Sequence, residues 1–148
     1  MARRREEEVA APRIVVERAR AREVSHELWR GLMRHNRGKA GPARYTRTVL
    51  SARDKAGMIV GGLILESYWR ESYVELLWVS PRMRGHDIGT RLVAEAERRA
   101  RRRGSVLMHL NTFSFQAPRF YEKLGFRRFG RMSGSPKGES RYFYFKRI

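Results

Sequence analysis

The sequence predicts a single-domain protein of the α/β (α+β) class, with a mixed sheet of six to seven strands and helices packed on both faces. Two observations lead to this prediction. The 148 residues are 41% hydrophobic, which is enough for one core without disulfide bonds. Short runs of β-branched and aromatic residues alternate along the chain with segments in which apolar residues recur every three or four positions.

The amino-terminal part begins with a charged segment, residues 1–12, which we expect to be a flexible tail, so that the domain covers residues 13–148. The apolar run 14–16 is predicted to form a short first strand. A helix is expected over 18–36, because apolar residues recur there at four-residue spacing. The recurring positions are Val24, Leu28 and Leu32.

Three further strands are expected over 45–53, 58–68 and 73–79, since each run is rich in β-branched and aromatic residues. The first two are joined by Asp54-Lys55-Ala56-Gly57, a composition typical of a hairpin turn. Ser80-Pro81 ends the third strand.

The longest periodic segment starts at Ile88 and predicts a helix with one apolar stripe that Gly104 ends. The stripe consists of Ile88, Leu92, Val93, Ala96 and Ala100. The arginine-rich stretch 98–103 lies in the last turns of this helix, where the helix dipole favours cations. We therefore interpret the stretch as a solvated helix end rather than a nucleic-acid contact.

The carboxy-terminal third predicts a strand over 105–111, a short helix over 116–124 and two antiparallel strands over 126–132 and 141–147. Pro118 fits only the first turn of that helix. The predicted order of elements is therefore β-α-β-β-β-α-β-α-β-β.

The composition excludes several classes of site. The chain has no cysteine, so it has no disulfide, no thiolate metal site and no cysteine nucleophile. Its four histidines are not at zinc-motif spacing, and no metal is expected. No apolar run reaches the roughly 18 residues that span a bilayer, and the charged start lacks the apolar segment of a signal peptide. We expect a cytoplasmic protein with no membrane partner.

The formal net charge is +18, which raises encounter rates with polyanions and leaves nucleic acid open as a partner. However, arginine outnumbers lysine 28 to 5, and the charge is spread along the whole chain. The favoured interpretation is a basic surface that helps to capture a phosphate-rich small molecule.

A loop between the strand ending at Val79 and the helix starting at Ile88 predicts an anion site. Its sequence contains Arg84-Gly85-His86-Asp87-Ile88-Gly89. A strand that passes through a glycine-containing loop into a helix directs unpaired amides and the positive end of the helix dipole at one spot. The loop fits neither the dinucleotide fingerprint nor the phosphate-binding loop of nucleotide hydrolases.

These residues resemble the Arg/Gln-x-x-Gly-x-Gly/Ala signature of the GNAT superfamily of acetyl-CoA-dependent N-acetyltransferases. The resemblance continues in Ala117-Pro118-Arg119-Phe120-Tyr121-Glu122-Lys123-Leu124-Gly125-Phe126 and covers roughly residues 13–148. It implies a GNAT-like fold with acetyl-CoA as cosubstrate. The residues that it assigns to cofactor binding, or places beside the bound thioester, are Trp78, Val79, Arg84, Gly85, His86, Asp87, Ile88, Gly89, Thr90 and Ser114.

The sequence departs from the family pattern at two of these positions. Asp87 stands where the signature has its first glycine, and a carboxylate beside a pyrophosphate is repelled by about 4 kcal/mol at 4 Å and an effective dielectric near 20. Ser114 stands where many relatives have asparagine, and serine is expected to cap the following helix.

Acetyl transfer requires a neutral amine, donors for the oxyanion and a proton for the leaving thiolate. The resemblance assigns the proton to Tyr121, and it places an oxyanion-binding amide near Val79. Two residues are candidates for the general base: His109, since a histidine side chain ordinarily titrates near neutrality, and Glu75 in the neighbouring strand. A chain of water molecules is a third alternative.

The acceptor is expected to be a primary amine of a small molecule. The stretch 110–117 is similar to a bacterial subgroup with Asp-Thr-Phe-Ser-Phe-Gln-Ala, some members of which acetylate aminosugar antibiotics, although this chain has Asn111 in place of the aspartate. Two alternatives remain: a protein or peptide acetyltransferase, and a non-catalytic or weakly catalytic protein of this fold that binds nucleic acid. The chain is expected to act as a monomer or homodimer.

Overall fold

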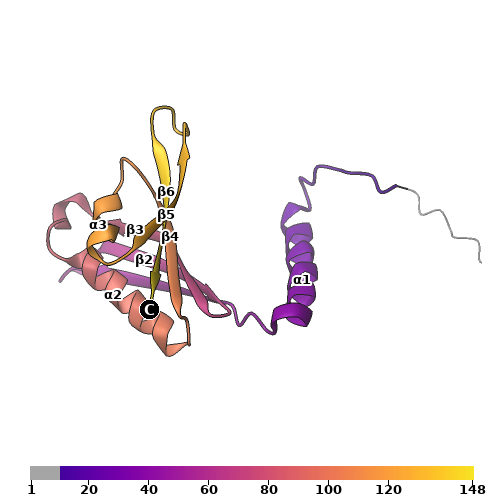
Figure 1. Ribbon diagram of the computed structural model, residues 1–148, viewed down its shortest axis with the longest axis horizontal. Coiled ribbons are helices and arrows are strands. Elements are labelled where there is room, and N and C mark those ends of the chain that lie inside the picture. The colour runs from indigo at the N-terminus through magenta and orange to yellow at the C-terminus, as the bar shows by residue number, and fades with distance from the viewer. Residues whose placement is uncertain (1–10) are drawn as a thin grey trace, which may run out of the picture. The chain divides into compact units, whose positions relative to one another are not determined.

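The computed structural model describes residues 11–148, which form two compact units, 11–41 and 42–148 (Figure 1). The predicted tail, residues 1–12, lies almost entirely outside the described residues. That residues 13–148 form one domain stays a prediction. The predicted strand over 14–16 is wrong. These residues are exposed and have no strand assignment, since an isolated strand of three residues needs a partner to hold it.

The first unit contains one helix, α1 (Ala21–Ala40), in which no residue is buried. The helix starts three residues later than predicted and ends four residues later, because it continues through Gly38 to Ala40. Gly41 follows as the cap, with φ of 74°. Pro42 follows and has no amide hydrogen to extend the helix.

The second unit is a six-stranded mixed sheet with the strand order β1-β2-β3-β4-β6-β5, so the predicted fold class and strand number are confirmed. Only β3 and β4 are parallel neighbours. The strands are β1 (Thr46–Arg53), β2 (Ile59–Tyr68), β3 (Glu71–Val79), β4 (Leu107–Phe113), β5 (Arg127–Ser133) and β6 (Ser140–Arg147).

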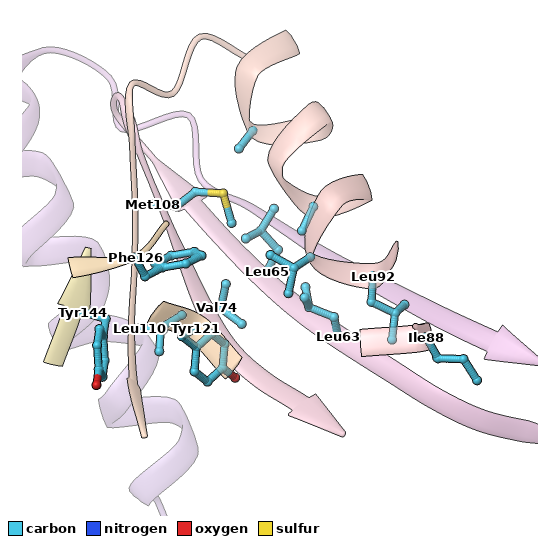
Figure 2. Packing of buried hydrophobic residues seen from close by; sticks show 13 residues of the cluster. Leu63, Leu65, Val74, Ile88, Leu92, Met108, Leu110, Tyr121, Phe126 and Tyr144 are labelled. Carbon is cyan, nitrogen blue, oxygen red and sulfur yellow. The ribbon is translucent and has the colours of Figure 1, made fainter. Parts of the chain in front are cut away.

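Two helices, α2 (Ile88–Arg102) and α3 (Pro118–Lys123), contribute to one core on one face of the sheet (Figures 1 and 2). The five residues of the predicted stripe in α2 are its buried residues, which confirms that prediction. They pack with alternate residues of the strands, such as Leu63, Leu65 and Met108, because successive side chains of a strand point to opposite faces. A helix over the other face stays a prediction.

Candidate active site

The parallel strands β3 and β4 pair over four residues only and then separate. The last pair is Val74 with Leu110, although β3 continues to Val79 and β4 to Phe113. A bulge in β3 lies at the same point, because Leu65 of β2 pairs with Val74 and the preceding residue of β2 already pairs with Leu76. The extra residue in the bulge is Glu75, and bulges commonly redirect a strand next to an active site. We call this separation the fork.

A cavity of about 810 Å³ lies at the fork. It is lined by the second half of β3, the end of β4, the loop before α2, the start of α2 and part of α3. The predicted site residues in its lining are Glu75, Trp78, Val79, Arg84, Gly85, Asp87, Ile88, Gly89, Thr90 and Tyr121. The structure therefore brings ten of the predicted residues together in one place.

The amino-terminal end of α2 opens into this cavity. The first helical hydrogen bond is donated by Arg91 to the carbonyl oxygen of Asp87 at 2.9 Å. The amides of Ile88, Gly89 and Thr90 precede it and have no acceptor within the helix. With the helix dipole they form a seat suited to a phosphate group. If the cavity holds coenzyme A, this end of α2 is the part that would bind its diphosphate group.

Asp87 adopts a left-handed backbone conformation, with φ of 57° and ψ of 11°. Glycine adopts this conformation without steric cost, whereas other residues are strained there by about 1 kcal/mol. This explains physically why the family signature has glycine at this position. Although Asp87 occupies the cap position of α2, its carboxylate forms no capping hydrogen bond.

Replacing Asp87 by glycine is expected to lower the Kd of acetyl-CoA about tenfold and to raise the free energy of unfolding by about 1 kcal/mol. The first effect comes from removing a negative charge beside the phosphate seat, and the second from releasing the backbone. Calorimetric titration and urea unfolding measure them. Asp87→Asn separates the two, because asparagine removes the charge and still tolerates the left-handed conformation. Unchanged or weaker binding in both variants would contradict the expectation.

Gly89 allows α2 to approach α3 closely. A Cβ atom at this position would lie 3.2 Å from Cζ of Phe120 and 3.8 Å from Cγ2 of Val79. Phe120 is the neighbour of Tyr121, and their rings meet edge to face at 5.1 Å. The absence of a side chain at 89 therefore lets the start of α2 lie close to Phe120 of α3.

Tyr121 lies in α3. It is buried as part of the core, and it also contributes to the lining of the cavity. Figure 2 shows it in the same cluster as Val74 and Leu110, the last pair before the fork. Burial raises the pKa of its hydroxyl to about 12, so the group stays protonated at neutral pH. The hydroxyl forms no hydrogen bond with any residue from 11 to 148, which leaves it free to donate to a ligand.

Glu75 lines the cavity and forms an ion pair with Arg47 of β1 at 2.5 Å. The same Nη1 atom of Arg47 also contacts Glu66 of β2 at 2.8 Å. All three side chains are partly exposed, so the pair is screened by solvent and can exchange. The carboxylate of Glu75 is therefore accessible from the cavity.

His109 does not line the cavity. It lies where β3 and β4 are still paired, opposite Tyr73, and its ring packs against the Tyr73 ring at 5.0 Å. Its Nε2 atom is buried and lies 4.0 Å from Glu71. Burial lowers the pKa of His109, and the nearby carboxylate of Glu71 opposes that shift.

Two other predicted residues, His86 and Ser114, also fall outside the cavity lining. The His86 Nδ1 atom lies 3.1 Å from the carbonyl oxygen of Arg84, within the loop. The Ser114 hydroxyl accepts a hydrogen bond from the amide of Ser140 at 3.0 Å and donates to Glu139. The expectation that Ser114 caps the following helix is wrong. That helix starts later, at Pro118, whose fixed φ suits the first turn, with Ala117 in the cap position and no side-chain cap.

Sequence reasoning missed several residues of the cavity lining, among them Asn111, Thr112, Phe115 and Gln116. Gln116 accepts hydrogen bonds from the amide of Phe113 at 2.8 Å and the hydroxyl of Thr112 at 3.1 Å, which fixes the loop after β4. The polar residue Asn111 in a strand was the available signal. Its position past the fork depends on where β3 and β4 stop pairing, which no sequence motif reports.

Among residues 11–148, no helix is long and apolar enough to cross a membrane. In the same part of the chain, no three side chains of the metal-binding kinds are grouped so as to hold a metal ion.

Comparisons with known proteins identify the family of the chain. The model of the GNAT acetyltransferase domain matches residues 45–128. Blasticidin-S acetyltransferase from Streptomyces morookaense is 37% identical over 93 residues, which are 62% of this chain and 68% of the relative. An acetyltransferase from Agrobacterium fabrum (strain C58) is 31% identical over 117 residues, 79% of this chain and 85% of the relative.

A crystal structure of an acetyltransferase from Bacillus cereus ATCC 14579 has a TM-score of 0.81 with this chain and is 29% identical. The match covers 91% of this chain and 98% of the other. Together with the domain match and the cavity at the fork, these similarities show that the chain belongs to the GNAT family and is an acetyl-transferring enzyme, with acetyl-CoA as the acetyl donor.

Proposed function

We propose that the enzyme transfers the acetyl group of acetyl-CoA to a primary amine of a small molecule, by direct attack within a ternary complex. The observation that carries this proposal is the composition of one cavity. Its lining combines the amino-terminal end of α2, the carboxylate of Glu75 and the phenol of Tyr121. The similarity to blasticidin-S acetyltransferase supports a small-molecule antibiotic or aminosugar as the acceptor.

In this proposal the diphosphate of coenzyme A lies at the amides that open α2, and the thioester lies in the fork. The amine nitrogen attacks the carbonyl carbon, and the oxyanion accepts a hydrogen bond from a β3 amide near Val79. The carbon–sulfur bond then breaks, and Tyr121 donates its proton to the departing thiolate. The proton lost by the amine passes to the base and on to solvent, from which Tyr121 is reprotonated.

Glu75 is the better supported of the two candidate bases. It lines the cavity, whereas His109 lies behind the last pair of β3 and β4. A water molecule between Glu75 and the amine would let the carboxylate act without direct contact. His109 remains a candidate only through such a relay.

An amine panel tests the proposed function. Blasticidin S, glucosamine, 1,4-diaminobutane and a peptide with a free amino terminus are each incubated with acetyl-CoA. The expected result is thiol release that matches the amount of N-acetylated product by mass spectrometry, with a small molecule as the best acceptor. Best turnover of the peptide would favour a peptide acetyltransferase. Absence of turnover, with salt-sensitive binding of duplex DNA, would favour the nucleic-acid alternative.

A further inference from the structure

The fork opens between two polar side chains. Because Val74 and Leu110 form the last backbone pair, Glu75 and Asn111 are the first residues past it on the two strands. Both line the cavity, one from each side of the opening. The mechanism above uses Glu75 and leaves Asn111 without a role.

The carboxamide of Asn111 is anchored by a hydrogen bond to a residue of the neighbouring strand. Its Nδ2 atom donates a hydrogen bond to the Tyr73 hydroxyl at 2.8 Å. Tyr73 lies in the paired part of β3, and its ring packs against His109 of β4. Within the described chain, the Oδ1 atom of Asn111 has no hydrogen-bond donor. Oδ1 of Asn111 is thus a hydrogen-bond acceptor at the apex of the fork that the described residues leave unused.

We propose that Oδ1 of Asn111 accepts a hydrogen bond from the acceptor amine and holds it at the apex of the fork, with Tyr73 as the residue that positions the amide. This inference rests on the proposed function. The attacking nitrogen needs hydrogen-bond acceptors for its N–H groups while its lone pair faces the thioester. One oxygen of Glu75, Oε2, already contacts Arg47, so a second acceptor at the fork would complete the hydrogen bonding of the amine.

The neutral amide also suits the protonation state that the reaction needs. A second carboxylate at this position would favour the ammonium form of the substrate and raise the pKa of its amine. An amide oxygen orients the same N–H group with no net charge. The substrate class is therefore a primary amine that enters as the free base and meets one charged partner rather than two.

Substitutions of Asn111 and Tyr73 test the inference, each assayed with the panel amine that gives the wild-type enzyme its highest kcat/KM. Asn111→Leu is expected to raise the KM of the amine about tenfold, which corresponds to one lost hydrogen bond of about 1.4 kcal/mol. The Kd of acetyl-CoA, measured by calorimetry, is expected to stay within about twofold. Tyr73→Phe is expected to raise the same KM about threefold, and to add nothing in the Asn111→Leu background. Tyr68→Phe on β2 is the matched control and leaves KM unchanged.

Asn111→Asp gives a readout that a merely structural role would not move. The aspartate keeps an acceptor oxygen, so the KM of the amine is not expected to rise. The acidic limb of the kcat profile is expected to shift upward by about one pH unit, because the added charge raises the pKa of the bound amine.

The outcomes separate the inference from the proposed function. If the wild-type enzyme turns over an amine and Asn111→Leu has an unchanged KM, or if Asn111→Asp leaves the pH profile in place, the inference is wrong and the proposed function stands. If the wild-type enzyme acetylates no amine of the panel, both are overturned. Equal loss of acetyl-CoA affinity in Asn111→Leu, Asn111→Asp and Tyr73→Phe would indicate a structural role and also overturn the inference.

Discussion

Replacing Tyr121 by phenylalanine is expected to lower kcat by about 10²–10⁴-fold and to leave the Kd of acetyl-CoA within about twofold. The phenol is the proposed proton donor to the thiolate, and its raised pKa keeps the proton on oxygen at neutral pH. The phenylalanine ring fills the same space against Phe126 and Phe120, so the core is preserved. Steady-state assays of thiol release measure kcat, and calorimetric titration measures the Kd of acetyl-CoA.

The matched control is Tyr144→Phe, on β6 next to Tyr121. Tyr144 is fully buried and its hydroxyl donates to Glu122 at 2.8 Å, away from the cavity lining. This variant is expected to lower stability by about 1 kcal/mol with little change in kcat. A normal kcat in Tyr121→Phe would show that the thiolate takes its proton elsewhere, and the assignment of Tyr121 would have to be abandoned.

Truncating Leu65 to alanine is expected to lower the free energy of unfolding by about 2–5 kcal/mol. Leu65 is 2% exposed and pairs with Val74 immediately before the bulge at Glu75. Its removal leaves a cavity directly behind the fork, because close-packed interiors relax only partly around a lost side chain. Urea unfolding of the full chain, followed by circular dichroism, measures the loss.

Val49→Ala provides the control on the neighbouring strand, since Val49 is 67% exposed. Its effect is expected to stay within about 0.5 kcal/mol. A similar loss in both variants would mean that packing behind the fork contributes nothing particular to stability, contrary to the core described above.

The elements of the fold were predictable where one local signal dominates. The apolar stripe of α2 identified its buried face residue by residue, and the turn before β2 identified a hairpin. The run 14–16 failed as a strand, because β-branched residues favour a strand only where a partner strand supplies hydrogen bonds. Helix α1 exceeded its predicted end, since Gly38 weakens a helix without ending it.

The site was predictable as far as its motifs extend. The loop before α2 and the position of Tyr121 follow from local sequence, and both line the cavity. The separation of His109 from the cavity depends on where two strands stop pairing, which no local pattern reports. Asp87 is intermediate: its departure from the signature was visible, but its left-handed backbone needed the structure.

Because the β3–β4 ladder ends early, this sheet has unpaired backbone N–H and C=O groups in its interior, which most sheets have only at their edge strands. Two stretches of backbone inside the sheet face each other without a shared ladder of hydrogen bonds. At an outer border such stretches recruit other polypeptides and promote aggregation. Here the unpaired stretches lie inside the sheet and are closed at one end by the last pair, Val74 with Leu110. In the proposed complex, a linear ligand with amide groups of its own would pair with these free backbone groups, so that the main chain itself contributes to binding.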